Sequence, residues 1–203
     1  LRFKDSNTCS DIQVNADKRL IDRRLKIAET YAPRPGGDEL EAVIGFDFGS
    51  TSSKIAVRLP FEVGSPTFII DAPVSIQNEG KEYLWLNCFW KEQDGQYSLI
   101  PSISGDSVEY RNIKSRFILE TSSENDLMVI VTAYFATVIK YIKGYLIENH
   151  DSYFGRKTNW EYHFGFPAAS LNESNLKKKL EKVRSSALHI VENDLEIKEE
   201  IVI

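Results

Sequence analysis

The chain has 203 residues, of which 42% are hydrophobic and 11% are aromatic, so it can bury a core as one large domain or two small ones. Its formal net charge of -5 argues against nucleic acid or an anionic membrane as the main partner. The two cysteines, Cys9 and Cys88, are too few for a disulfide framework and lack the spacing of a metal site. A reducing, cytoplasmic setting is therefore expected.

Residues 1–41 are predicted to form an extension in front of the main domain. Apolar residues recur at near-helical spacing within residues 11–30, which indicates an amphipathic helix. Residues 31–39, YAPRPGGDE, carry the prolines and glycines of a linker. Nothing in this extension points to chemistry.

A block of short strands is predicted to follow. Apolar and β-branched runs bounded by turn residues predict strands at residues 42–48, 53–59, 67–70, 82–90 and 97–101. Because these strands are joined by short connections, we expect them to pair mainly in the antiparallel sense.

Helices and strands alternate in the second half of the chain. The periodicity predicts a helix at 126–148, a strand at 160–166, a helix at 172–191 and a strand at 196–203. The longest apolar run is interrupted by Lys140 and Lys143, which favours a buried helix over a membrane span. The order of elements predicts an α/β domain with a mixed sheet. The chain stops inside a predicted strand, so we expect it to be part of a longer protein.

The stretch AVIGFDFGSTSSKIAVRLP, residues 42–60, places Asp47 at the end of a strand and hydroxyl residues directly after Gly49. Glycine allows a tight turn and a close approach to a ligand, and successive N–H groups in such a turn can bind an anion. A carboxylate beside phosphate oxygens requires a cation between them, and Mg²⁺ suits one aspartate plus substrate phosphates. The turn thus predicts a clasp for a magnesium nucleotide. The alternative is a plain hairpin whose polar tip is capped by the acid.

The clasp is not a Walker A loop. That motif places glycine directly before the lysine and continues as a helix. Here Ser53 precedes Lys54, and a strand is predicted to follow.

The segment VIGFDFGSTSSKIAV, residues 43–57, resembles the first phosphate-binding motif of the superfamily of actin, sugar kinases and heat-shock chaperones. Within it, residues 42–203 are most similar to the first half of the ATPase domain of DnaK-type chaperones. Three further segments support this likeness in order: APVSIQNEGKEYLWLNCFW (72–90), NIKSRFI (112–118) and YHFGFPAAS (162–170). The resemblance implies a ribonuclease H-like, actin-like ATPase lobe with a mixed β-sheet and flanking helices.

The resemblance also implies a role for each matched residue. Asp47 would hold Mg²⁺ through water, and Lys114 would stabilise charge on the γ-phosphate and place the attacking water. Pro167 would act as a switch that links the nucleotide state to the lobe surface. The residues that would bind the β- and γ-phosphates are Gly49, Ser50, Thr51 and Ser52. The alternative for Lys114 is a solvated surface lysine, and for Pro167 a strand terminator.

This sequence departs from the family pattern in several places. Ser50 replaces the commoner threonine, and Phe48 replaces a leucine. The family's second phosphate motif, its adenosine motif and its Glu-Pro element are not found in the sequence. The chain therefore corresponds at most to the first lobe, and alone it is expected to bind nucleotide poorly.

The function expected from the resemblance is coupling of Mg-ATP binding and hydrolysis to a conformational change. ATP or ADP and Mg²⁺ would be the ligands, and a protein client or co-chaperone would be the partner. Two alternatives remain open. One is a small-molecule, sugar-type kinase of the same superfold, and the other is an interaction scaffold that does not hydrolyse nucleotide.

Overall fold

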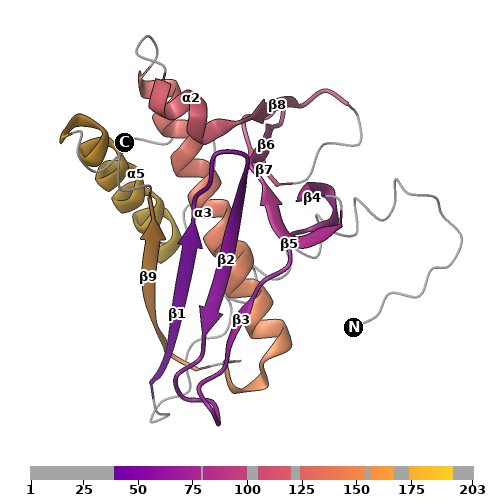
Figure 1. Cartoon of the computed structure of the whole chain (residues 1–203), viewed down its shortest axis with the longest axis vertical. Helices are drawn as coiled ribbons and strands as arrows, with labels where there is room; N and C mark the ends of the chain where they lie inside the picture. Colours follow the sequence, from indigo (N-terminus) through magenta and orange to yellow (C-terminus); the bar gives the residue numbers. More distant parts are fainter. Residues whose placement is uncertain are drawn as a thin grey trace, which may run out of the picture.

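A β-hairpin formed by β1 and β2 lies at the centre of the main sheet (Figure 1). The computed structural model describes residues 39–78, 80–99, 105–119, 124–153, 156–166 and 174–193. The strands of the main sheet are β1 (Leu40–Asp47), β2 (Ser52–Arg58), β3 (Thr67–Ile69), β4 (Gln77–Asn78), β5 (Lys81–Leu86) and β9 (Thr158–Gly165). The extension predicted at residues 1–41, up to residue 38, lies outside the described residues, as does the strand predicted at 196–203.

The main sheet is mixed, as the order of elements predicted. Its path is β4-β5-β2-β1-β9, and β3 pairs with the second half of β2 while β5 pairs with its first half. β1 runs antiparallel to β2 and parallel to β9. The carboxyl ends of β1 and β9 therefore meet at one edge of the sheet, beside the β1–β2 turn.

A second, three-stranded sheet has the order β7-β6-β8. It comprises β6 (Cys88–Lys91), β7 (Tyr97–Ser98) and β8 (Val108–Arg111). The strand predicted at 82–90 is in fact two strands, β5 and β6, which separate at Asn87 and belong to different sheets. That prediction was wrong because periodicity does not reveal where a strand leaves one sheet for another. Neither β8 nor the helix after it was predicted.

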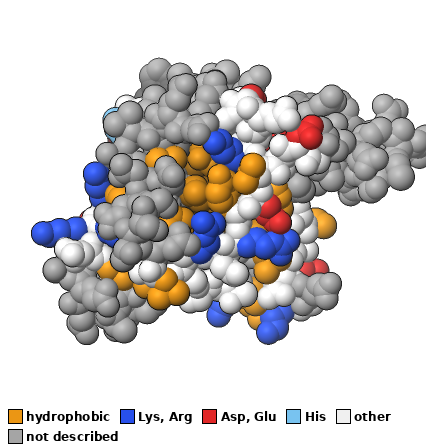
Figure 2. Space-filling view, turned by 90° about the horizontal axis from the view of Figure 1, so that it is seen from above, with side chains coloured by type: hydrophobic (Ala, Val, Ile, Leu, Met, Phe, Trp, Pro, Cys, Tyr) orange, Lys and Arg blue, Asp and Glu red, His pale blue; other side chains and the backbone are white. Residues whose placement is uncertain are grey.

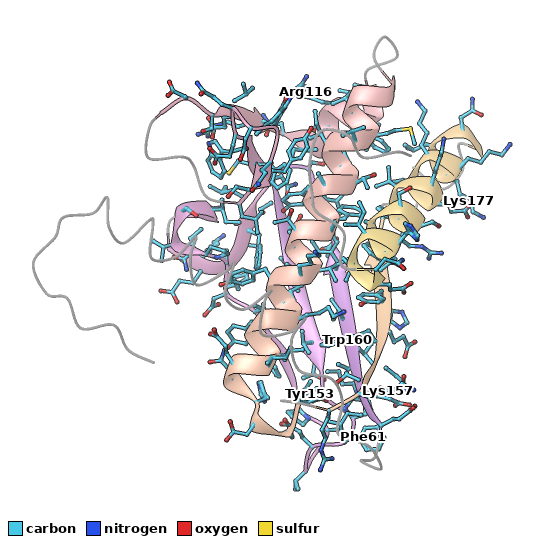
Figure 3. All side chains as sticks on the ribbon, turned by 180° about the vertical axis from the view of Figure 1, so that it is seen from behind. Phe61, Arg116, Tyr153, Lys157, Trp160 and Lys177 are labelled. Carbon is cyan, nitrogen blue, oxygen red and sulfur yellow. The ribbon has the colours of Figure 1, made fainter. Side chains whose placement is uncertain are left out.

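Two long helices cover one face of the main sheet (Figures 1 and 3). α3 (Glu124–Asn149) and α5 (Ser174–Glu192) confirm the helices predicted there, and they pack against each other. Short helices are α2 (Ile113–Leu119) and the 3₁₀ turns η1 (Val74–Ile76) and η2 (Asp151–Tyr153). Figure 3 shows Trp160 of β9 between the sheet and α3, and the Lys143 ammonium lies 5.0 Å from the centre of its ring.

Residues 127–149 of α3 are apolar and long enough to cross a membrane, by length and composition alone. However, 78% of the tested window is buried inside the protein. This burial agrees with the buried helix that the sequence predicts, and α3 forms part of the core.

The core beneath the β1–β2 turn is aromatic. Side chains of β1 alternate between buried and more exposed positions, so one face of the strand points at α3. The Phe46 ring lies 5.0 Å from Phe135 in an edge-to-face arrangement and 5.9 Å from Phe164, centre to centre. Phe48 and Tyr134 complete the cluster at 6.1 and 6.2 Å from Phe46. These contacts join β1, β9 and α3 into one packed unit.

We predict that Phe46→Ala lowers the free energy of unfolding by about 3–5 kcal/mol, because it leaves a cavity among four other rings. Urea denaturation measures this loss. Phe61→Ala is the matched control, since Phe61 is 59% exposed and its truncation should change stability by about 0.5 kcal/mol or less. Equal losses in the two variants would contradict this account of the core.

Candidate functional site

The β1–β2 turn holds most of the residues that the sequence singled out. β1 ends at Asp47, whose register partner across the hairpin is Lys54, and β2 begins at Ser52. The side chains of Asp47, Ser50 and Thr51 are exposed. The turn therefore presents a carboxylate and two hydroxyl groups at the carboxyl end of β1.

Gly49 has no room for a side chain. A Cβ atom at this position would lie 2.0 Å from the backbone oxygen of Ser52, far inside van der Waals contact. The restriction comes from the close approach of the two arms of the turn. The predicted tight turn at Gly49 is thus present, and its shape requires glycine.

The carbonyl groups of the turn are bonded to donors from outside the hairpin. Asn87 Nδ2 donates to the Gly49 oxygen at 2.7 Å, and the Asn87 backbone N–H donates to the Thr51 oxygen at 3.2 Å. The ammonium of Lys114 donates to the Phe48 oxygen. These bonds fix the outline of the turn from Phe48 to Thr51.

Three N–H groups of the turn differ from its carbonyl groups in their hydrogen bonding. Within the described part of the chain, the backbone amides of Gly49, Ser50 and Thr51 donate to no acceptor. Consecutive free amides beside exposed hydroxyls are the donors of an anion-binding turn. The carbonyl side of the turn is thus occupied by protein donors, while its N–H side is available for a ligand.

Lys114 reaches the turn from α2, 66 residues further along the chain than Phe48. Its side chain is only 4% exposed, and its ammonium lies 5.5 Å from the centre of the Phe48 ring. The interpretation of Lys114 as a solvated surface lysine is therefore wrong. The structure brings together Asp47, Lys114 and the hydroxyl-rich turn.

Burial lowers the pKa of Lys114, and the charge of Asp47 partly opposes that shift by favouring the ammonium. The desolvation effect is the larger of the two. The negative charge of Asp47 thus compensates only in part for the burial of the ammonium. Figure 2 shows this end of the molecule from above, where both basic and acidic side chains lie beside a hydrophobic patch.

The end of β9 lies directly beside the turn. Asp47 is in register with Gly165, and the Phe48 N–H donates to the Gly165 oxygen at 3.4 Å. A Cβ atom on Gly165 would lie 3.6 Å from Asp47 Oδ1, which shows how close β9 passes to the carboxylate. Pro167, the predicted switch, lies outside the described residues.

Sequence reasoning missed Asn87, which is 2% exposed. Ser53 Oγ donates to Asn87 Oδ1 at 2.6 Å, and the Tyr134 hydroxyl donates to the same oxygen at 3.3 Å. A signal was present, because Asn87 is the one polar residue in the apolar run LWLNCFW at 84–90. A buried amide inside such a run needs specific partners.

The donor set suits a magnesium nucleotide better than a protein-bound metal. Among the described residues, no group of three or more His, Cys, Asp or Glu side chains could hold a metal ion. Asp47 is the acid at the turn, and Mg²⁺ commonly uses one or two carboxylates together with substrate phosphates and water. Gly49 is half-buried, and Ser50 and Thr51, which follow it in the turn, are exposed.

We predict that Gly49→Ala destabilises the protein by about 1–3 kcal/mol, because the added Cβ forces the two arms of the turn apart. Gly45→Ala is the matched control on the same strand. A Cβ at Gly45 meets its nearest neighbouring atom, the Ala56 oxygen, at 3.8 Å, so stability should change by about 0.5 kcal/mol or less. Urea denaturation of both variants measures the free energy of unfolding. If Gly49→Ala leaves this free energy unchanged, a side chain at position 49 is not crowded by Ser52.

Comparison of the chain with models of protein families, with curated proteins and with solved structures found no match. Any role for Asp47, Lys114 and the turn must therefore be argued from their geometry and from the sequence motif.

Proposed function

We propose that residues 42–203 form the first lobe of an actin-like ATPase of the heat-shock-chaperone type. The observation that carries this proposal is the position of Lys114. Its buried ammonium lies against the turn that holds the phosphate-binding motif and within the electrostatic influence of Asp47. The motif and the lysine were matched separately in the sequence, so their meeting in space supports the resemblance.

The sheet supports the same proposal. A hairpin at the centre of a mixed sheet, a parallel strand on its outer side and helices on one face are compatible with an actin-like lobe. The proposed site lies at the carboxyl ends of β1 and β9, which is where ligands of open α/β sheets usually bind.

In this proposal the turn binds the β- and γ-phosphates of ATP through the amides of Gly49, Ser50 and Thr51 and the hydroxyls of Ser50, Thr51 and Ser52. Asp47 would hold Mg²⁺ through water, and the ion would neutralise charge on the phosphates. Lys114 has three N–H donors, of which one is used by the Phe48 oxygen. The remaining donors would stabilise charge that develops on the γ-phosphoryl group.

The proposed whole protein couples nucleotide binding to a change in conformation, with a protein client or co-chaperone as partner. Pro167, two residues beyond Gly165, would transmit the change. The buried free thiol of Cys88, whose pKa is raised to about 11 by burial, is consistent with the cytoplasmic setting that we propose.

We predict that Asp47→Ala weakens binding of Mg-ATP about tenfold or more and abolishes its dependence on Mg²⁺, because the variant lacks the carboxylate that would hold the ion. Calorimetric titration of the longest natural form of the protein measures both effects. Glu41→Ala is the control, since Glu41 is an exposed acid of the same strand, far from the turn. Absence of Mg-ATP binding in the wild-type protein would overturn the proposal and favour an interaction scaffold.

We predict that Lys114→Met lowers the rate of ATP hydrolysis about 10²–10³-fold while Mg-ATP still binds, since a single preorganised donor contributes about this much. Methionine preserves the length of the buried chain without its charge. Arg116→Met, on the exposed side of the same helix, is the control and should hydrolyse ATP at the wild-type rate. Phosphate transfer to a small polyol instead of water would identify a sugar-type kinase.

A further inference from the structure

Asn87 occupies a buried position between the β1–β2 turn and α3. It lies at the break where β5 ends and β6 begins, so its backbone leaves the main sheet there. Its side chain makes contacts to the turn, to β2 and to α3. Among the described residues, Asn87 and Lys114 are the two whose side chains donate hydrogen bonds to carbonyl groups of the turn.

The contacts of Asn87 use both ends of its amide. The oxygen accepts hydrogen bonds from Ser53 Oγ at 2.6 Å and from the Tyr134 hydroxyl at 3.3 Å. The nitrogen donates to the Gly49 oxygen at 2.7 Å. The nitrogen of the Asn87 amide must face Gly49, because the Gly49 carbonyl can only accept a hydrogen bond.

The partners of Asn87 are themselves fixed. Ser53 and Tyr134 are both 0% exposed, so neither hydroxyl can turn to water without disrupting the core. Burial also raises the pKa of Tyr134, which keeps its hydroxyl protonated and able to donate. The ring of Tyr134 packs against Phe48 at 6.1 Å, centre to centre.

From these contacts we infer that Asn87 is the positioning residue of the proposed phosphate-binding turn. It acts through Gly49 and Thr51 and touches no phosphate. By tying both carbonyls to the core, it sets the turn in one shape before any ligand arrives. Ligand binding then need not order the turn, which would otherwise weaken affinity. This inference rests on the proposed function, because the turn's ligand is a phosphate group.

The test uses Asn87→Ala and Asn87→Asp in the longest natural form of the protein. Alanine removes all side-chain contacts. Aspartate keeps the shape and both acceptor contacts, but its carboxylate oxygen repels the Gly49 oxygen. Gln77→Ala is the matched control, since Gln77 Nε2 also donates to a backbone carbonyl, that of Ala72 at 2.8 Å, away from the turn.

Two measurements are needed on each variant. Hydrogen exchange of the ligand-free protein reports the order of residues 48–53, with residues 130–142 of α3 as an internal reference for global stability. Calorimetric titration with Mg-ATP reports affinity. We expect exchange in the turn to accelerate at least about tenfold more than exchange in α3 in both Asn87 variants, and Mg-ATP affinity to fall about tenfold. Gln77→Ala should resemble the wild type in both measurements.

The outcomes separate this inference from the proposed function. If the wild-type protein binds Mg-ATP and Asn87→Asp binds it equally well with a protected turn, the inference is overturned and the proposed function stands. If Asn87→Ala does not fold, the isosteric Asn87→Asp protein decides the result. If the wild-type protein binds no Mg-ATP, the proposed function fails, and the positioning role fails with it.

Discussion

The shape of the β1–β2 turn depends on hydrogen bonds to its carbonyl groups from residues far along the chain. The Lys114 ammonium donates a hydrogen bond to the Phe48 oxygen. Asn87 donates to the Gly49 oxygen through its side chain and to the Thr51 oxygen through its backbone N–H. A turn stabilised in this way needs no carbonyl–amide bond of its own, and the amides of Gly49, Ser50 and Thr51 stay unpaired within the described residues. One set of contacts thus gives the turn a defined outline and leaves free the amides that, in the proposed function, would bind an anion.

The sheet topology determines which groups can meet at this turn. Because β9 runs parallel to β1 in exact register from Leu40 to Asp47, its end must lie beside the carboxylate. Because β5 pairs with the first residues of β2, the chain leaves the sheet at Asn87, next to the turn. The aromatic cluster around Phe46 then fixes the spacing between β1, β9 and α3. The site is therefore a consequence of strand pairing together with the core beneath it.

The sequence predicted the elements whose patterns are local. The β1–β2 hairpin, α3, β9 and α5 have long apolar periodicities or clear turn residues, and all were found close to the predicted bounds. The division of 82–90 was not predicted, since the apolar pattern continues across Asn87. Periodicity also gave no position for Lys114, whose burial depends on a contact with Phe48. Only the resemblance in NIKSRFI indicated that this lysine belongs to the site.

Burial of Lys114 is unfavourable to the fold taken alone. Its ammonium has exchanged water for one backbone carbonyl and an aromatic ring, and desolvation is the main cause of its lowered pKa. A contact between a cation and a ring contributes only about 0.5–2 kcal/mol, and a buried ion costs several kcal/mol. Such a local conflict is expected where a residue serves a ligand, which is the role that we propose for Lys114. In the proposed function, the phosphates of the nucleotide would add the negative charge that Asp47 alone supplies only in part.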